Sequence, residues 1–370
     1  MNIGIIGYRG FAAFCVDALR DVPLANVVAL CGRNQDALQA SARNLRVRKT
    51  YSDCLEMIAD PEIELVHIST QPADHPSMAV AAIDLGKHVM IEKPLAVDLA
   101  GGEAVMAALA RNPGVVGGID YVMRYSPLYE RVQAIVSGGL LGELTHVSFQ
   151  NFASDEGLDN DHWFWNSEQS GGIFVEHGVH FFDIIGSIVG SPAMEVQART
   201  WLRSGNHPHE DRVSAVVTHE NGITATYYHA FNRPGILERQ IAQFTFERGH
   251  VTVHGWTPTR IAIDGIVDNA SLSALESLFL QLSVTHEIDP VRGGGKDHDV
   301  AFRVQSTEDL GDPTPLYASA VRAAFDDVIR AAATGTSPRV TVADGFDSLR
   351  VALAARESAA QGVVVALPHS

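Results

Sequence analysis

The sequence predicts an α/β domain with a parallel sheet, followed by an α+β domain with a mostly antiparallel sheet. Up to about residue 120, short β-branched runs alternate with longer helical stretches, which is typical of βαβ units. Beyond that point, runs of alternating polar and apolar residues recur between turn residues. A length of 370 residues also exceeds one ordinary core. We therefore expect two domains, residues 1–120 and residues 121–370.

The elements follow in a regular order. In the first domain, short apolar runs predict strands at residues 3–7, 27–31, 64–69, 88–92 and 114–119. Helical stretches separate them near residues 11–20, 35–45, 73–85 and 97–110. A helix near residues 127–137 opens the second domain, whose strands are predicted in LTHVSFQNF, AMEVQARTWLR, RVSAVVTHE, ITATYYHAF, RQIAQFTFE, HVTVHGW and RIAIDG. Helices near residues 316–333 and 344–361 close the chain, and the last is a candidate to pack back on the first domain.

Composition restricts the partners and the compartment. The 44 acidic against 27 basic side chains give a formal charge of −17, which disfavours nucleic acid and anionic membrane surfaces. The three cysteines lack CxxC spacing, so we interpret them as reduced core thiols rather than disulfide or zinc ligands. No apolar run reaches the roughly 18 to 20 residues of a membrane span, and the first residues, MNIGIIG, already form a predicted strand. We expect a soluble, cytoplasmic protein.

The first predicted strand ends in GIIGYRGFAAF, a partial dinucleotide-binding fingerprint. That fingerprint requires glycine at the tight turn, glycine beside the pyrophosphate and a small residue where helix meets strand. Gly7, Arg9 and Ala12 occupy these positions, so the middle glycine is missing, and Gly10 stands one place later. By itself the motif fits a glycine turn of another α/β protein equally well. Its place between a strand and a helix favours phosphate binding, and Arg9 is a candidate to reach a phosphate oxygen.

The second predicted strand ends where an acidic residue would bind the ribose 2′-hydroxyl of NAD. The sequence there is Cys31-Gly32-Arg33-Asn34, which contains no acid. Because Gly32 leaves space and Arg33 offers a guanidinium to a 2′-phosphate, we favour NADP over NAD as cofactor. The alternative for Arg33 is a solvated surface charge.

Several motifs, in the same order along the chain, resemble one known family. GKHVMIEKPL at residues 86–95 contains an EKP element. The other matches are Thr70-Gln71-Pro72 with His75, Arg124-Tyr125-Ser126-Pro127, SGGLLGEL, Gly171-Gly172 leading to Glu176, Gly178, His180 and Asp183, and DGFDSLRVALAARESAAQG. On these residues the chain is similar to the glucose-fructose oxidoreductase, inositol dehydrogenase and rhizopine catabolism (Gfo/Idh/MocA) family over nearly its whole length. Two positions depart from the family pattern: Arg9 replaces the usual middle glycine, and Glu176 stands where Asp is general.

The resemblance implies a Rossmann domain for the cofactor and a second domain whose open sheet mediates oligomerisation. We therefore expect a homodimer or homotetramer that binds substrate between its two domains. The resemblance also implies that Lys93, Glu176 and His180 form the catalytic set. The candidate cofactor-binding residues are Gly7, Tyr8, Arg9, Gly10, Phe11, Ala12, Gly32, Arg33, Asn34, Thr70, Pro72, His75, Glu92 and Lys93.

The chemistry of the catalytic set agrees with alcohol oxidation. A secondary hydroxyl must lose a proton as its carbon gives a hydride to nicotinamide, and His180 is the natural base because imidazole titrates near neutrality. On an α-helix, Glu176 and His180 at i and i+4 share a face, with Asp183 on the same side. Lys93 follows the carboxyl end of a strand and can donate a hydrogen bond to the substrate oxygen. Without its motif, Lys93 would be interpreted as a surface lysine.

A metal site is the alternative interpretation of this segment. Glu176, His177 and His180 give the order EHxxH, whereas HExxH is the order that places two histidines at i and i+4. Adding His162 as a distant third ligand does not change this preference. We therefore predict no metal, a core position for His177 and a proton-relay position for His180.

Aromatic and polar side chains gather just before this segment. Aromatic faces beside amide and imidazole groups suit a ring that carries hydroxyls, although core or interface packing explains them almost equally well. The candidate substrate contacts are His162, Trp163, Trp165, Asn166, Arg124 and Tyr125, and more weakly His229 and Asn232.

We predict an NAD(P)-dependent dehydrogenase or reductase acting on CH–OH groups of a sugar, glycoside or cyclitol. Two alternatives are a lyase or glycosidase with transient redox of a bound nicotinamide, and a non-catalytic NAD(P)-binding regulator.

Overall fold

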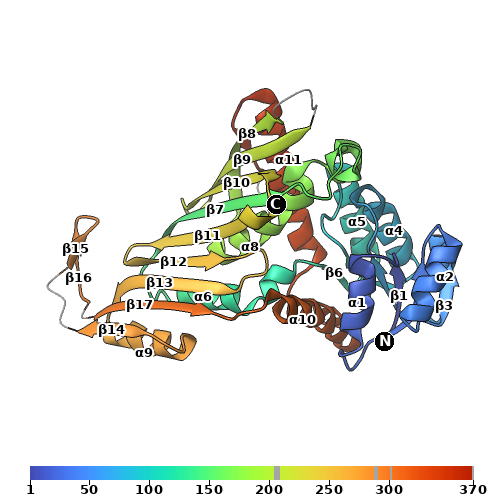
Figure 1. Cartoon of the computed structure of the whole chain (residues 1–370), viewed down its shortest axis with the longest axis horizontal. Helices are drawn as coiled ribbons and strands as arrows, with labels where there is room; N and C mark the ends of the chain where they lie inside the picture. Colours follow the sequence, from blue (N-terminus) through green and yellow to red (C-terminus); the bar gives the residue numbers. More distant parts are fainter. Residues whose placement is uncertain (204–208, 287–290, 301, 369–370) are drawn as a thin grey trace. The chain divides into compact units, whose positions relative to one another are not determined.

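We analysed a computed structural model that describes residues 1–203, 209–286, 291–300 and 302–368 (Figure 1). The chain forms two compact units, each built on its own sheet. The first unit contains residues 1–125, 162–183 and 318–353, and the remaining segments form the second. The chain therefore passes between the units several times, whereas the sequence predicted a single boundary at residue 120.

The first unit contains a six-stranded, wholly parallel sheet. Its strands are β1 (Asn2–Ile6), β2 (Asn26–Cys31), β3 (Lys49–Tyr51), β4 (Leu65–Ile68), β5 (His88–Ile91) and β6 (Gly117–Ile119). They lie in the order β3-β2-β1-β4-β5-β6. β4 is buried at every position, as expected for a parallel sheet that is covered on both faces. All five predicted strands are present, and β3 is an additional edge strand whose three residues are too short for a periodic pattern.

Helices alternate with these strands, which confirms the predicted α/β class. They are α1 (Phe11–Leu19), α2 (Gln35–Asn44), α3 (Cys54–Ala59), η1 (Pro72–Asp74), α4 (His75–Asp84), α5 (Leu99–Arg111) and η2 (Val122–Tyr125). The closing helices are α10 (Pro313–Thr334) and α11 (Val342–Gln361). α10 packs against the parallel sheet, because the ring of Phe325 meets the ring of His67 on β4 edge-on, with centroids 4.9 Å apart.

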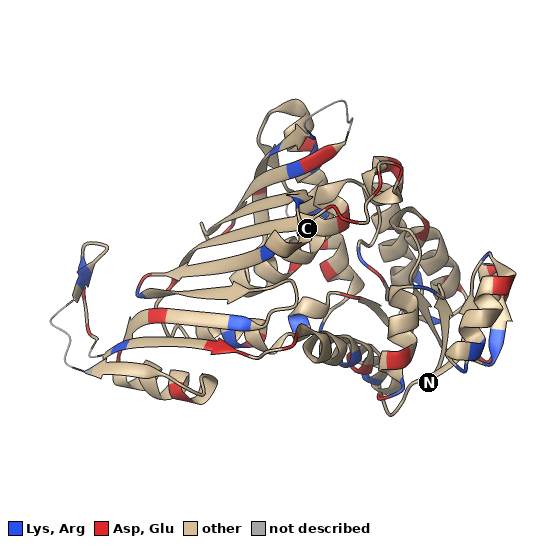
Figure 2. Ribbon diagram, in the orientation of Figure 1, with Lys and Arg blue, Asp and Glu red and all other residues tan. Residues whose placement is uncertain are grey.

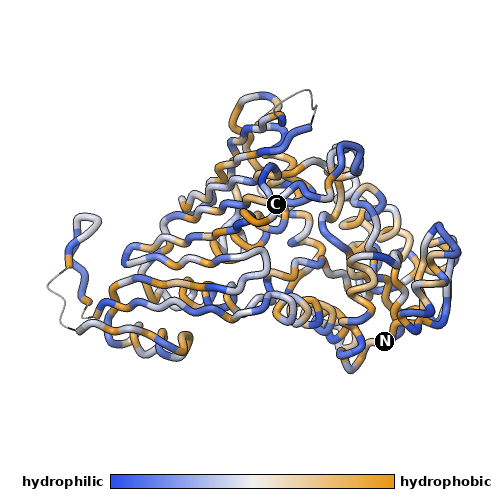
Figure 3. Tube along the Cα trace, in the orientation of Figure 1, coloured by the Kyte–Doolittle hydropathy of each residue, from blue (hydrophilic) through white to orange (hydrophobic). Residues whose placement is uncertain are grey.

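The second unit contains a ten-stranded open sheet. Its strands are β7 (Leu144–Ser154), β8 (Ala193–Leu202), β9 (Glu210–His219), β10 (Thr224–Arg233), β11 (Arg239–Phe246), β12 (Gly249–His254), β13 (Arg260–Val267), β14 (Ser283–His286), β17 (Phe302–Asp309) and β18 (Val365–Ala366). The order is β14-β17-β13-β12-β11-β7-β10-β9-β8-β18, and of the described pairs only β7 and β10 run parallel. Figure 3 shows hydrophilic and hydrophobic residues alternating along these strands. The predicted mostly antiparallel sheet is therefore confirmed.

The remaining elements connect these strands. They are α6 (Pro127–Ser137), η3 (Trp163–Trp165), α7 (Ser167–Ser170), η4 (Phe174–Gly178), α8 (Val179–Val189), η5 (Gly235–Leu237), α9 (Asn269–Leu278) and a hairpin of β15 (Val291–Gly293) and β16 (Lys296–His298). β17 was not predicted because its buried positions, Val304, Ser306 and Glu308, are mostly polar. Glu308 is tolerated there because it forms an ion pair with Arg131 of α6.

Charge and hydropathy are distributed as in a globular protein. In Figure 2, basic and acidic residues are interspersed over both units. Among the described residues, one helical stretch, Ser167–Val189, is long and apolar enough to cross a membrane by length and composition. Within its most apolar window, 72% is buried inside the protein, which is the pattern of a core helix.

The contact between β6 and α10 gives a stability prediction. A Cβ on Gly118 would lie 2.5 Å from Cγ2 of Val328, whereas a Cβ on Gly114 would meet nothing within 4 Å. We expect Gly118→Ala to lower the free energy of unfolding by about 1–3 kcal/mol through overpacking, and Gly114→Ala to be near neutral. Chemical denaturation of both variants checks this ranking. Equal midpoints would contradict the tight packing of α10 on β6.

Candidate active site

The segment that carries the expected acid and base is a helix that changes pitch. η4 (Phe174–Gly178) is a π-helical turn, and α8 continues it as an α-helix. Glu176 lies in the π turn and His180 lies in the first turn of α8. The segment is therefore not the uniform α-helix on which the expected alignment of these two residues was based. Such π turns occur frequently at functional sites.

Lys93 follows β5 and binds the π turn. Its Nζ donates to Oε1 of Glu176 at 2.6 Å and to the Glu176 carbonyl oxygen at 3.0 Å. The two side chains are only 18% and 13% exposed, so the pair is largely shielded from water. Two charge-assisted bonds to one residue hold the ammonium against this turn. The structure thus brings together two of the three residues of the expected catalytic set.

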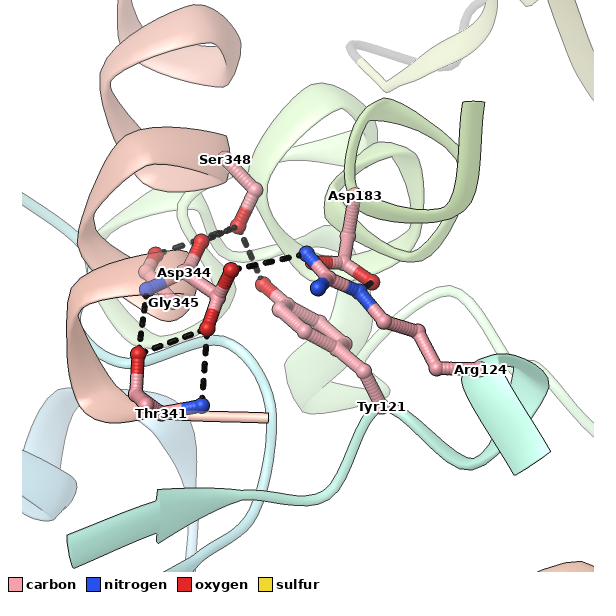
Figure 4. A network of polar contacts seen from close by, with 7 residues as sticks. All are labelled: Tyr121, Arg124, Asp183, Thr341, Asp344, Gly345 and Ser348. Carbon is pink, nitrogen blue, oxygen red and sulfur yellow. Dashed lines mark hydrogen bonds and ion pairs between the residues drawn. The ribbon is translucent and has the colours of Figure 1, made fainter. Parts of the chain in front are cut away.

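His180, the third residue, is buried beside two other rings. Its ring centroid lies 6.4 Å from that of His177 and 6.0 Å from that of Tyr121, whose hydroxyl contacts Ser348 Oγ at 2.5 Å (Figure 4). Burial, and then the nearby charge of Lys93, lower the pKa of His177 to about 3. His177 therefore remains neutral near neutral pH.

Asp183, one turn beyond His180, anchors α8 within the first unit. The Arg124 guanidinium donates to both Asp183 oxygens, at 2.8 and 2.5 Å, and to Asp344 Oδ1 at 3.0 Å (Figure 4). Asp344 is held in turn by the backbone N–H and hydroxyl of Thr341, at 2.8 and 2.6 Å. Burial raises the pKa of Asp183 to about 7, against the opposing effect of Arg124. Arg124, expected to contact substrate, here joins η2, α8 and α11.

The other expected substrate residues also have structural partners. The Tyr125 hydroxyl donates to Asp327 of α10 at 2.8 Å. His162 Nδ1 accepts from the N–H of Phe164, and Asn166 Oδ1 caps α7 by accepting from the N–H of Glu168.

The two tryptophans lie within this short segment and are partly exposed. Trp163 packs against His162 with ring centroids 5.5 Å apart, and Trp165 meets Phe164 edge-on at 4.9 Å. Because both residues are partly exposed, their rings are candidates to offer apolar surface to a ligand.

The loop after β1 has the geometry of a phosphate-binding turn. Gly7 has φ 130°, and a Cβ there would lie 2.7 Å from the Ser69 carbonyl oxygen and 2.9 Å from Cβ of Ala12. Only glycine fits this position. Gly10 also has positive φ, and α1 begins at the next residue, Phe11. A strand, a glycine turn and a nine-residue helix therefore follow one another as a dinucleotide site requires.

The end of β2 differs from the expectation in one respect. A Cβ on Gly32 would lie 2.2 Å from Cε1 of Tyr8, so the Tyr8 ring fills the space that we expected Gly32 to leave for a cofactor. The Arg9 guanidinium lies over the same ring, 5.1 Å from its centroid. Arg9 and Arg33 are both exposed, and Asn34 caps α2 by accepting from the N–H of Ala37.

His75 connects two loops at the carboxyl edge of the sheet. Its Nδ1 lies 2.7 Å from the Pro94 carbonyl oxygen and its Nε2 lies 3.1 Å from the Thr70 carbonyl oxygen. The ring is fully buried, and burial lowers its pKa. His75 thus ties the loop that contains Pro72 to the Lys93-Pro94 turn, a positioning contact that the sequence did not predict.

Glu92 lies in a buried cluster that sequence analysis missed. Burial raises its pKa well above the usual range, and the neighbouring Asp120 raises it further. The signal was available in the sequence, since Asp120 directly follows a predicted strand. Among the described residues, Cys15, His67 and Glu92 bring potential metal-binding atoms within 4.8 Å of one another, and neither His177 nor His180 belongs to this group.

Comparison with known proteins agrees with this geometry. Residues 1–118 match the family model described as an oxidoreductase family with an NAD-binding Rossmann fold, and residues 129–255 match the GFO/IDH/MocA C-terminal domain. The chain is 26% identical over 196 residues to scyllo-inositol 2-dehydrogenase (NAD(+)) of Bacillus subtilis, a match spanning 53% of this chain and only about half, 54%, of that relative. It is 23% identical over 367 residues to D-xylose 1-dehydrogenase (NADP(+)) 2 of Haloferax volcanii, covering 99% and 100% of the two chains.

Solved structures share the fold. Levoglucosan dehydrogenase in complex with NADH superposes with a TM-score of 0.82 at 19% identity and full coverage of both chains. Myo-inositol 2-dehydrogenase from Lactobacillus plantarum gives a TM-score of 0.78 at 19% identity, covering 100% of this chain and 99% of that one. The resemblance expected from the EKP and glycine–histidine motifs is confirmed, and the chain is an oxidoreductase that belongs to the Gfo/Idh/MocA family.

Proposed function

We propose that this enzyme transfers a hydride between a nicotinamide cofactor and a secondary alcohol or ketone of a sugar, glycoside or cyclitol. The observation that carries the proposal is the shielded Lys93–Glu176 pair, which holds an ammonium at the π turn that leads into α8, the helix that contains His180. The names of the relatives, an inositol and a xylose dehydrogenase, support this substrate class.

The residues of the loop after β1 fit a dinucleotide. The backbone at Gly7 is too closely packed for a side chain, and the glycine turn leads directly into α1. Gly7, Arg9, Gly10 and the first residues of α1 would hold the pyrophosphate. When bound, the nicotinamide supplies the hydride acceptor or donor.

The proton chemistry belongs to His180 and Lys93. We assign His180 Nε2 or Nδ1 as the group that takes the hydroxyl proton during oxidation and returns it during reduction. The Lys93 ammonium donates a hydrogen bond to the same substrate oxygen and stabilises its developing negative charge. Glu176 contacts Lys93 directly, so we assign it as the residue that positions this donor.

Cofactor choice depends on the exposed residue that follows Gly32. Arg33 projects from the loop after β2 and is exposed, so its guanidinium can bind a 2′-phosphate. We therefore propose NADP as the preferred cofactor and NAD as the alternative.

The substrate contacts and the assembly depend on residues that follow the predicted boundary at residue 120. We propose that Trp163 and Trp165 stack on the substrate ring, with Arg124 and Tyr125 supporting the site through their partners. β8 and β9 expose Trp201, Leu202 and Val216, which supports assembly into a homodimer or homotetramer through the open sheet. We also propose a cytoplasmic location, with no nucleic-acid or membrane partner.

A panel of sugars and polyols, incubated with NAD or NADP and followed at the absorbance band of the reduced nicotinamide, tests the function. Net accumulation of reduced cofactor supports a dehydrogenase. Bond cleavage without accumulation would indicate instead the lyase or glycosidase with internal redox, and tight cofactor binding without any turnover would indicate the regulator.

The catalytic assignment predicts that Lys93→Met and His180→Ala each lower kcat by at least about 100-fold, because each removes a group that acts on the reacting oxygen. The dissociation constant for cofactor stays near that of the wild type. Lys296→Met, a change at an exposed lysine on β16, serves as the matched control. Wild-type kcat in either active-site variant would remove the assignment.

If Arg33 binds the 2′-phosphate of NADP, Arg33→Ala is expected to raise the dissociation constant for NADP about tenfold and to change that for NAD little. Titrations of intrinsic fluorescence measure both constants. Arg43→Ala, an exposed arginine of α2, is the control that removes a charge elsewhere in the unit. An equal loss for the two cofactors would contradict a specific contact with the 2′-phosphate.

The ion network of Figure 4 predicts a ranking of stabilities. Arg124→Ala removes the partner of the buried Asp183 carboxyl, which must then take up a proton or remain an unpaired charge, and is expected to cost about 3–5 kcal/mol of unfolding free energy. Asp344→Asn keeps that pair and is expected to cost less than about 1 kcal/mol. Thermal and chemical unfolding check the order. A larger loss for Asp344→Asn would show that the bidentate pair is not the main contact.

A further inference from the structure

Two of the three cysteines lie in direct contact. Cys31 is the last residue of β2 and Cys54 is the first residue of α3, and their Sγ atoms are 3.2 Å apart. This separation is about 1 Å longer than a disulfide bond, so small side-chain rotations would allow the bond to form. From the sequence, all three cysteines were interpreted as reduced core thiols; the contact between these two was not expected, since 23 residues separate them along the chain.

We propose that Cys31 and Cys54 form a redox-active dithiol that a small aliphatic disulfide converts to an intramolecular disulfide. The two thiols differ in access. Cys31 is fully buried, whereas Cys54 is partly exposed. An accessible thiol next to a buried one is the arrangement of an attacking and a resolving cysteine.

The electrostatic surroundings differ between the two cysteines and favour Cys54 for the first attack and Cys31 for the resolving step. The hydrogen bond from Cys31 lowers the pKa of Cys54, and the positive charge of Arg33 acts in the same direction. Burial and the carboxylates of Asp53 and Asp74 oppose this effect. The same hydrogen bond and burial raise the pKa of Cys31. Cys54 is therefore the nucleophile and Cys31 the resolving thiol.

The reaction is an ordinary thiol–disulfide exchange. The Cys54 thiolate attacks one sulfur of the small disulfide, forms a mixed disulfide and releases one small thiolate, which takes up a proton. The Cys31 sulfur then attacks Cys54 Sγ, loses its proton and displaces the second small thiol. The protein gives up two electrons and two protons, and the small disulfide is reduced to two thiols.

The dithiol lies where it can affect the nucleotide loop, an inference that rests on the proposed cofactor site. The Cys31 carbonyl accepts a hydrogen bond from the N–H of Gly7 at 3.0 Å, and Gly32 and Arg33 follow Cys31 directly. A bond from Cys31 to α3 restrains the backbone that presents both residues, and it removes the Cys54 thiol, whose ionised form the charge of Arg33 favours. We infer that oxidation weakens dinucleotide binding.

The experiment uses the reduced full-length protein and glutathione disulfide. After incubation, free thiols are alkylated, and intact mass and peptide mapping identify the products. We expect a linked peptide pair containing Cys31 and Cys54 and a loss of about 2 Da from the intact mass, corresponding to two hydrogen atoms. Cys15→Ala retains this product, because Cys15 is a separate buried thiol. Cys54→Ser abolishes it, and Cys31→Ala stops at the mixed disulfide on Cys54.

Two outcomes overturn the dithiol proposal. Thiols that remain free in the wild type would overturn it, and so would a mixed disulfide on Cys54 that never resolves. Circular dichroism of each variant checks that it is folded.

For the link to the cofactor, we expect the dissociation constant for NADP or NAD to rise at least about fivefold on oxidation of the wild type, and not in Cys54→Ser. Equal constants for the two redox states refute the coupling alone, whereas a reduced protein that binds neither dinucleotide refutes the proposed function and leaves the mapped disulfide intact.

Discussion

The ion pair between Lys93 and Glu176 is the contact on which the candidate site depends. It joins the turn after β5 to a helix 83 residues later in the chain, and it gives the ammonium both a carboxylate and a backbone carbonyl as acceptors. Either charge alone would be costly in such a shielded position, because burial disfavours an unpaired ion. As a pair they hold a hydrogen-bond donor at the π turn that leads into α8, the helix that contains His180. The proposed hydride transfer uses such a donor together with a titratable base at one oxygen atom.

Both partners of this pair are held by further contacts. On one side, His75 links the carbonyl groups of Thr70 and Pro94, which sets the direction of the turn that presents Lys93. On the other side, the Arg124–Asp183 pair anchors the helix that follows the π turn. Positioning residues of this kind surround a reactive group because a small displacement of that group changes the reaction rate strongly. The π turn accommodates Glu176 without interrupting the helix that carries His180.

Local patterns predicted the architecture correctly and the polar partners poorly. The alternation of strands and helices, the glycine turn at Gly7 and the alternating strands of the second sheet all depend on neighbouring residues, and all are present. The EKP and glycine–histidine motifs also contain Lys93 and Glu176, which are in direct contact. By contrast, Arg124 and Tyr125 were expected to face substrate, and they bind carboxylates of distant helices instead.

The sequence by itself was sufficient to predict the two-sheet fold and the family, and to identify Lys93, Glu176 and His180 as candidates. The period of the hydrophobic residues, the motifs and their order can all be read along the chain without knowledge of its folding. Long-range packing alone settled which acceptor Lys93 binds, that the Tyr8 ring covers Gly32, and that Cys31 meets Cys54. A charged or polar side chain can form hydrogen bonds or ion pairs of similar energy with many different partners. Its choice among them depends on which elements the complete fold brings within about 3 Å, and no local pattern records that distance.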